Sequence, residues 1–351
     1  MRARRSIECR ETFSRTPFAR RLARLAVTAP SIQTILEPIA ADMQLVDVAI
    51  RDNLASEVSL INSISGYIIT AGGKRLRPAL LLLMAQAHGH DGPHRHALAA
   101  VVELIHTATL LHDDVVDESE LRRGRSTSNA TWGNAASVLS GDFLYSRSFQ
   151  MMVAAGNLRV LQILADATNV IAEGEVLQLL NMHDAAIDVE RYMQVIHYKT
   201  AALFEAAARI GAVLAGCAAP AEEAAATYGR ALGMAFQLVD DALDYRGDAA
   251  EMGKNVGDDL REGKPTLPLI VAMQRAAPAE RALIEDAVRS GSVEQLPRIV
   301  QIVRDCDALS AVDDAAQCQL DVARETLAAL PPSAARTALD QLCTYSLQRR
   351  S

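Results

Sequence analysis

Three aspartates stand close together in the motif Asp113-Asp114-Val115-Val116-Asp117, which closes an apolar stretch that begins at Leu104. On a helix, Asp113 and Asp117 are four residues apart and share one face, where two like charges repel. A hard divalent cation would offset this repulsion. Mg²⁺ takes one or two carboxylates and completes its octahedron with water and phosphate oxygens. The motif therefore indicates a magnesium site, with a solvated helix end as the alternative.

The same spacing recurs at Asp240-Asp241-Ala242-Leu243-Asp244, again at the end of an apolar helical stretch. Metal sites in helical bundles are built from side chains of facing helices, so two distant motifs can meet across a bundle core. Such an arrangement could hold several Mg²⁺ ions around one diphosphate. The pair of motifs is a much stronger signal than either motif alone.

A basic segment, Gly72-Gly73-Lys74-Arg75-Leu76-Arg77-Pro78, precedes an apolar run. Pro78 suits the first turn of the following helix, and Gly89 suits its end. Because the residue before a proline is disfavoured in the α region, we expect the basic side chains, Arg77 included, on a loop at the helix N-terminus. Cations and the helix dipole would both favour an anion there. A solvated basic turn is the alternative.

Further basic residues follow each acidic motif. Arg122 and Arg123 come directly after the first motif, and Lys254 and Lys264 follow the second. Arginine binds phosphate through two parallel hydrogen bonds and lysine supplies a point charge, so this placement suits a diphosphate held by metals and cations. Each of these residues could also be an ordinary surface charge.

The elements that must position these residues are helical. Apolar residues recur at spacings of three and four, as between Val101 and Ala108, and no proline occurs between Pro93 and Pro220. Aromatic residues make up only 4% of the chain, which favours helices packed on helices. The sequence shows no repeat with a period of about 20–50 residues, which argues against a solenoid. We predict an all-α fold, a single-domain bundle over residues 35–351 around a central apolar cavity.

The first 34 residues form an Arg-rich, acid-poor extension, which we expect to be disordered. Its composition is also that of a transit peptide, although an unstructured bacterial extension or a misassigned start codon fits better. The net charge of −8 argues against nucleic acid as the main partner. No apolar run reaches the ~18 residues of a membrane span, and the cysteines show no zinc or disulfide pattern. We therefore expect a soluble, cytoplasmic protein.

Taken together, these features resemble the all-trans polyprenyl diphosphate synthases, especially the octaprenyl diphosphate synthases of bacteria. The resemblance covers roughly residues 35–350. It is carried by both acidic motifs, the basic segment, the linking lysines and the segments 106–119, 133–139 and 174–179. It implies the isoprenoid synthase type of helical bundle and a homodimer.

The resemblance also implies site residues. Those implied for roughly two to three Mg²⁺ ions are Asp113, Asp117, Asp240, Asp241 and Asp244. Those implied for the allylic diphosphate are Arg122, Lys199, Thr200, Gln237, Lys254 and Lys264. Those implied for isopentenyl diphosphate are Lys74, Arg77, His106 and Arg123, of which the histidine would otherwise be read as a packed helix residue. The catalytic set would be Asp113, Asp114, Asp117, Asp240, Asp241 and Lys199.

The implied reaction is the repeated trans condensation of isopentenyl diphosphate with an allylic diphosphate, most simply farnesyl diphosphate. Neutralisation of the leaving diphosphate frees an allylic cation, which the isopentenyl double bond attacks. The released diphosphate can then accept the proton, so no side-chain base is required. Water must be excluded from the cation, and an apolar helical interior does this. The product would partition into a membrane and supply the side chain of a respiratory quinone.

Product length is partly readable from the residues before the first motif. Ala108 and Thr109 lie five and four positions before Asp113, one turn away on the inward face. Their small side chains leave a path into the bundle, which predicts a long product. Phe149 and Met152 on the next helix are candidates for the floor of that path. The resemblance implies C40, and the sequence does not separate it from C35 or C45.

Three other classes of protein share part of this pattern. A class I terpene cyclase also uses an Asp-Asp-x-x-Asp motif, but it needs no second diphosphate site, so Lys74, Arg77 and the second motif argue against it. A non-catalytic subunit of a heteromeric synthase should have lost acidic or basic positions, and none is lost. His112-Asp113 is shared with HD-type phosphohydrolases, but further His and Asp at suitable spacing are missing.

Overall fold

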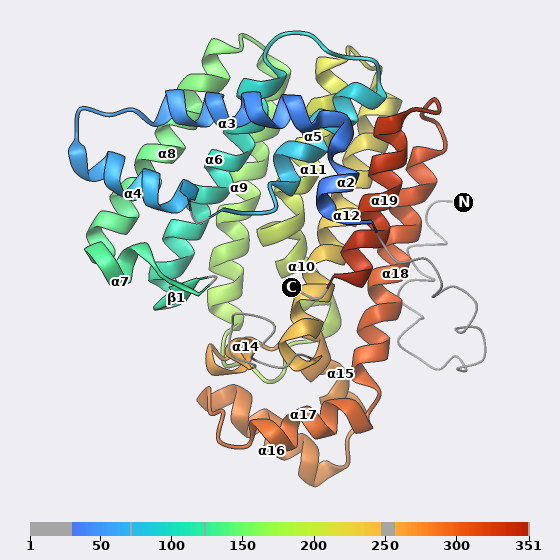
Figure 1. Cartoon of the computed structure of the whole chain (residues 1–351). Coiled ribbons are helices and arrows are strands. Elements are labelled where there is room, and N and C mark those ends of the chain that lie inside the picture. The colour runs from blue at the N-terminus through green and yellow to red at the C-terminus, as the bar shows by residue number, and fades with distance from the viewer. Residues whose placement is uncertain (1–29, 71, 123, 247–256, 350–351) are drawn as a thin grey trace.

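The computed structural model describes residues 30–70, 72–122, 124–246 and 257–349, and most of them are helical (Figure 1). The long central helices come mostly from the apolar, proline-free part of the chain. They are α5 (Leu76–Ala87), α6 (Arg95–Val116), α8 (Asn134–Ala154), α9 (Leu158–Asn181), α11 (Ala202–Leu214) and α12 (Ala219–Arg246). The predicted all-α fold is confirmed.

Further helices complete the bundle (Figure 1). On the N-terminal side they are α2 (Ile32–Ile35), the 3₁₀-helix η2 (Glu37–Ile39), α3 (Ala40–Leu54) and α4 (Ser59–Thr70). In the middle of the chain, α10 (Val189–Ile196) and the π-helix η3 (His197–Ala201) lead directly into α11. The C-terminal helices are α14 (Asp258–Arg261), α15 (Leu267–Arg275), α16 (Pro278–Ser290), α17 (Leu296–Asp305), α18 (Ala308–Leu327) and α19 (Ala334–Gln348).

The core joins the two helices that carry the acidic motifs. Helix α11 packs against α5, α9 and α12, and α6 packs against α3, α5 and α8. Their facing side chains are fully buried and mostly Leu and Ala, whose small volumes allow close helix packing. None of the helices in the described residues is long and apolar enough to cross a lipid bilayer.

A small hairpin follows α6 and precedes α7 (Ser128–Trp132). Its strands β1 (Leu121–Arg122) and β2 (Arg125–Ser126) pair antiparallel, with Arg122 opposite Arg125. The hairpin is fixed to α4 because the Tyr67 hydroxyl donates to Ser126 O at 2.7 Å. The hairpin thus carries Arg122 to the end of α6.

Helix α5 begins two residues earlier than the sequence suggested, at Leu76 rather than at Pro78. Arg77 therefore lies within the first helical turn, and its expected position on a loop was wrong. The first four N–H groups of a helix have no intrahelical partner, so the proline removes no hydrogen bond there. Gly89 ends the helix as expected, with φ of 79° and its N–H donating to Gln86 O at 2.9 Å.

Most of the predicted extension, residues 1–29, lies outside the described residues. Helix α2 begins at Ile32, inside the predicted bounds of that extension. The Ser31 hydroxyl caps it by accepting a hydrogen bond from Thr34 N at 3.2 Å.

Candidate active site

The first acidic motif lies at the C-terminal end of α6. Asp113 and Asp114 belong to its last turn, and Asp117 is its C-cap. Because a helix dipole places negative partial charge at this end, the carboxylates need cations nearby. Asp114 is only 5% exposed, and Arg122 binds its Oδ1 through Nε at 2.8 Å and Nη2 at 2.7 Å. Burial raises the pKa of Asp114, and Arg122 opposes that shift.

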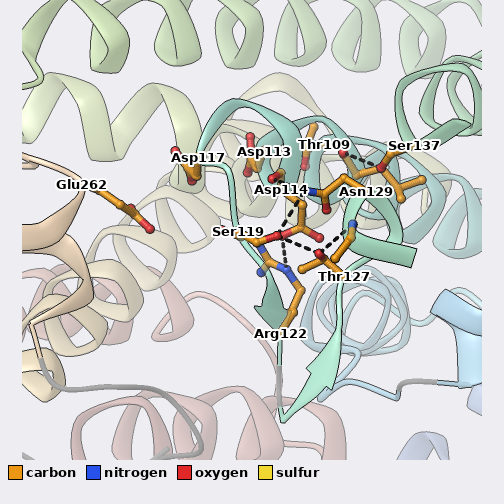
Figure 2. A network of polar contacts seen from close by, with 12 residues as sticks. Thr109, Asp113, Asp114, Asp117, Ser119, Arg122, Thr127, Asn129, Ser137 and Glu262 are labelled. Atoms are coloured by element: carbon orange, nitrogen blue, oxygen red, sulfur yellow. Dashed lines mark hydrogen bonds and ion pairs between the residues drawn. The ribbon is translucent and has the colours of Figure 1, made fainter. Parts of the chain in front are cut away.

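Figure 2 shows how the turn after α6 holds this ion pair. The Asn129 side-chain amide donates to the backbone oxygens of Asp114 at 3.0 Å and of Ser119 at 3.1 Å. The Thr127 hydroxyl donates to the same Ser119 oxygen at 2.7 Å. Asp114 therefore pairs with the hairpin, whereas Asp113 and Asp117 contact cations from other segments of the chain.

Lys199 is the cation beside Asp113. Its Nζ lies 3.7 Å from Asp113 Oδ1 and 2.6 Å from Glu175 Oε2 on α9. Burial raises the pKa of Glu175 to about 7, and the ammonium of Lys199 opposes the shift. Lys199 is thus held between two carboxylates at the end of the first motif.

Lys199 and Thr200 lie on the π-helix η3, which interrupts the run from α10 to α11. A Cβ at Gly174 of α9 would lie only 2.7 Å from Lys199 N and 2.7 Å from Tyr198 Cβ. The glycine therefore lets η3 approach α9 closely. Single π-helical turns inside α-helices are frequent at functional sites, because they redirect a few side chains.

The second motif lies near the C-terminal end of α12, and Asp241 is its most buried member, at 4% exposed. The Tyr192 hydroxyl donates to Asp241 Oδ2 at 2.5 Å, and Gln237 Nε2 donates to Oδ1 at 2.7 Å. Burial raises the pKa of Asp241 to about 7, and both hydrogen bonds oppose that shift. The carboxyl is thus fixed in orientation at a considerable cost in desolvation.

The other two carboxyls of this motif bind different segments. The N–H groups of Gly257 and Asp259 donate to Asp244 at 3.1 and 3.3 Å, and burial raises the pKa of Asp244 to about 6. Asp240 pairs with Arg349, whose Nη1 lies 2.7 Å from its Oδ1. Every acid of the second motif therefore has a polar partner in the described part of the chain.

Two bridges bring the acidic motifs together. In η3, Lys199 faces Asp113 while the neighbouring Thr200 hydroxyl donates to Gln237 at 2.9 Å, and Gln237 in turn binds Asp241. The segment Gly257–Lys264 makes the second bridge. Its first residues bind Asp244, and its last, Lys264, lies 3.0 Å from Asp117. The motifs thus converge on shared cations and amides from opposite sides.

A cationic and aromatic cluster lies beside Asp240. Arg77 is half-buried with its guanidinium carbon 4.4 Å from the Phe204 ring centroid, and desolvation lowers its pKa to about 10. The guanidinium carbon of Arg349 lies 3.6 Å from the ring centroid of Phe236, and that centroid lies 5.7 Å from the ring centroid of Phe204. Cations over aromatic faces are stabilised by the ring quadrupole, so the cluster can keep charge in a dry place. Such a place suits a second diphosphate.

The remaining predicted binding residues are distributed as follows. Lys74 Nζ lies 5.9 Å from the Tyr345 ring centroid on α19. His106 is half-buried on α6, two turns before the first motif. Arg123 and Lys254 lie outside the described residues.

The number of carboxyls that lie together limits how a metal ion can bind. Among the described residues, no group of three or more His, Cys, Asp or Glu side chains is close enough to bind a metal alone. Mg²⁺ needs only one or two carboxylates when phosphate and water complete its shell, so sparse ligands on each side of a diphosphate are sufficient. Asp117 Oδ1 is buried without a hydrogen-bond partner, which leaves it open to a cation. The residues fit a metal that arrives with its substrate.

Comparison with known proteins is decisive at this point. A polyprenyl synthetase family model matches residues 58–303, more than half of the chain. The chain belongs to that family. It is 49% identical to octaprenyl diphosphate synthase of Escherichia coli over 91% of this chain and 99% of that protein. It is a trans-prenyl diphosphate synthase.

Two further members of the polyprenyl synthetase family bear on the details. An all-trans-nonaprenyl diphosphate synthase of Rhodobacter capsulatus, described as geranyl-diphosphate specific, is 45% identical over 90% of this chain and 98% of that protein. A polyprenyl synthase of Caulobacter crescentus superposes with a TM-score of 0.89 at 45% identity, covering 93% of this chain and 100% of that one. That structure holds calcium and isoprenyl diphosphate.

The residues predicted to set product length in this synthase lie on α6 and α8, which pack together. Ala108 is fully buried, and the half-buried Thr109 hydroxyl donates to His106 O at 2.9 Å. Met152 is 1% exposed, whereas Phe149 is 38% exposed and packs on Tyr145. Met152 therefore lies in the interior, and Phe149 lies at its edge.

Three residues of the synthase site were not assigned from the sequence. Glu175 stood within a segment that resembled the family but received no role, Tyr192 gave no signal, and Arg349 gave only a weak one. Each reaches the site through a contact with a sequence-distant residue. The adjacent arginines at the end of the chain, Arg349 and Arg350, were the one hint that spacing could have offered.

Proposed function

We propose that this synthase makes a long-chain all-trans polyprenyl diphosphate, octaprenyl (C40), by Mg²⁺-dependent addition of isopentenyl diphosphate to an allylic primer. The observation that carries the proposal is the double bridge between the acidic motifs. Lys199 faces Asp113, and Lys264 faces Asp117. The same two segments reach the second motif, the first through Gln237 and the second directly at Asp244. Two facing sets of carboxylates and cations suit one diphosphate between them.

The proposed roles follow from these positions. Asp113, Asp117, Asp240, Asp241 and Asp244 would hold the metal ions. When bound, Mg²⁺ supplies Lewis-acid neutralisation of the charge that develops on the leaving diphosphate. Lys199, Lys264, Arg122, Thr200 and Gln237 would bind and orient the allylic diphosphate through charge-assisted hydrogen bonds. Binding of calcium and isoprenyl diphosphate by the related Caulobacter structure supports a divalent ion at such a site.

The isopentenyl diphosphate would bind at the cluster of Lys74, Arg77 and Arg349 beside Asp240, with His106 and Arg123 as the further predicted contacts. The two diphosphates would then lie on the two sides of the second motif, which the pairing of Asp240 with Arg349 supports. The apolar interior below excludes water from the allylic cation, and the released diphosphate can take the proton from the new alkene. No side-chain base is required for that step.

Product length rests on the interior beside α6. Ala108 is buried and small, so its own side chain would not block a chain growing past α6, which supports a long product over C15 or C20. The similar E. coli protein makes octaprenyl and the similar R. capsulatus protein nonaprenyl diphosphate, so C40 is the central expectation. The geranyl specificity of the latter makes the primer, farnesyl or geranyl diphosphate, a separate test.

A homodimer is part of this proposal. Helices α8 and α9 expose large apolar side chains, among them Leu139, Val153 and Leu180 at 66, 67 and 71%. Exposed apolar area on adjacent helices is typical of a protein interface. We also propose that the enzyme works in the cytoplasm and that its product enters a membrane as the side chain of a respiratory quinone.

The deciding experiment is incubation of the purified protein with labelled isopentenyl diphosphate, farnesyl or geranyl diphosphate, and Mg²⁺. Chromatographic sizing of the dephosphorylated product should give C40 as the main species, and EDTA should abolish its formation. A ladder that stops at C20, or a cyclic hydrocarbon formed without isopentenyl diphosphate, would contradict the proposal. Turnover that continues in EDTA would contradict its metal dependence.

A further inference from the structure

The loop after α9 contacts the turn that directly precedes Lys264, through His183 and Gly263. His183 occupies this loop with φ of 62°, in the left-handed region that few residues other than glycine adopt. Its N–H donates to Gly263 O at 2.8 Å, and its Nδ1 lies 3.2 Å from Val288 O in α16. One residue thus joins the end of α9, the turn before Lys264 and the end of α16.

The imidazole ring of His183 lies so close to Gly263 that it leaves no space for a side chain at that position. A Cβ at Gly263 would lie 2.3 Å from His183 Nδ1 and 2.4 Å from its Cε1, distances that side chains do not adopt. Gly263 also has φ of 67°, which favours glycine independently. The imidazole ring therefore fixes the path of the backbone directly before Lys264.

The position of Lys264 depends on that path. Its N–H donates to Asp259 O at 2.8 Å, and its Nζ reaches Asp117 Oδ2 at 3.0 Å. A displacement of about 1 Å at such a group can cost on the order of 100-fold in rate. We infer that His183 is a positioning residue for the prenyl transfer reaction, acting on Lys264 through Gly263. This rests on the role of Lys264 under the proposed function.

A histidine that only packs the loop is the alternative, and a double-mutant cycle separates the two. We would measure kcat, the KM for the allylic diphosphate and the Tm of His183→Ala, Lys264→Ala and the double variant. His183→Ala should lower kcat about 10–100-fold, and the double variant should be within about threefold of Lys264→Ala. His183→Asn should recover most of kcat, because its side-chain amide can take the position of the imidazole Nδ1 and asparagine tolerates the left-handed conformation.

Several outcomes would overturn the inference. One is a lower Tm in His183→Ala with an unchanged kcat. Another is a double variant whose fold-loss in kcat equals the product of the losses in the two single variants. Normal kcat in Lys264→Ala would also overturn it, and would show that the proposed role of Lys264 had failed first. If His183→Ala does not fold, Gly263→Ala tests the same contact from its other side. It should lower kcat by a similar factor, and unchanged kcat would refute the inference.

Discussion

The Nζ of Lys264 lies 3.0 Å from Oδ2 of Asp117, although the two residues are 147 positions apart in the chain. Both side chains are largely buried, at 15 and 11% exposed, and Lys264 also pairs with Glu262. Burial alone would lower the pKa of Lys264, but Asp117 and Glu262 hold it above its ordinary value. The lysine therefore stays charged between the two motifs and is available to a diphosphate that displaces the carboxylates.

Lys264→Ala should reduce kcat/KM for the allylic diphosphate by roughly 100-fold, because a cation that neutralises the leaving group is lost. It should also lower the free energy of unfolding by about 2–3 kcal/mol, since Asp117 would remain buried beside other acids without its partner. Steady-state kinetics and urea unfolding measure the two effects. Lys264→Arg keeps the charge and should retain most of the stability. Equal losses of stability in both variants would contradict this explanation.

Asp113→Ala and Asp240→Ala should each reduce kcat by about 1,000-fold or more, because each removes a proposed metal ligand from one side of the diphosphate. Both variants should remain folded, since the removed side chains are partly exposed and lie at the site rather than in the apolar core. The matched control is Asp286→Ala on α16, whose side chain is 89% exposed and should tolerate the change. Substantial turnover by either active-site variant would count against the shared metal site.

Much of this site could be predicted because its signals are local. The i, i+4 spacing of the aspartates in an apolar stretch indicated both motifs, and the helices that carry them, α6 and α12, form as expected. Helix-forming composition and the long proline-free run indicated the all-α fold. These features depend only on residues within a few turns of one another.

The contacts that organise the site could not be predicted in the same way. The π-helix that presents Lys199 depends on a missing side chain at Gly174, on a different helix. Arg349 reaches Asp240 only because α19 ends beside α12. His183 gave no sequence signal, since its role depends on a turn eighty residues later. Tertiary packing determines each of these three contacts, and the hydrophobic periodicity of the sequence carries no information about tertiary packing.

The metal-free protein should lose stability as the pH rises from about 5 to about 8. Burial raises the pKa of Asp241 to about 7, so the folded state holds a proton that the unfolded state has released. This contribution is fully present below the ordinary carboxyl pKa and is lost as the pH rises through about 7. Urea unfolding in EDTA measures it, with a slope of at most about 1.4 kcal/mol per pH unit from this group.

Asp241→Asn isolates the contribution of this one carboxyl, because the amide cannot ionise. The difference in unfolding free energy between the variant and the parent protein should therefore shift in favour of the variant by about 2–3 kcal/mol between roughly pH 5 and pH 8. Titrating groups far from Asp241 cancel in this comparison, whereas its charged neighbours Asp240 and Asp244 do not cancel fully. A difference that stays constant with pH would show that Asp241 titrates normally in the folded protein.

Ala108→Tyr should shorten the main product to C15–C20. Ala108 is fully buried on the inward face of α6, one turn before Asp113, so a tyrosine there would fill the path that a growing chain must take. The added ring should also cost about 1–3 kcal/mol of stability through overpacking, which leaves the protein folded. Reversed-phase chromatography of the dephosphorylated products measures the length.

The matched control is Ala108→Ser, which adds only one atom and should leave the product length unchanged. If α6 forms one wall of the product path, length should fall with side-chain volume at position 108 while the rate of the first condensation stays similar. This separates blockage of the path from damage to the metal site, because the latter would slow every condensation equally. Full-length product from Ala108→Tyr would mean that the chain grows along another face, and Met152 on α8 would then lie outside the product path as well.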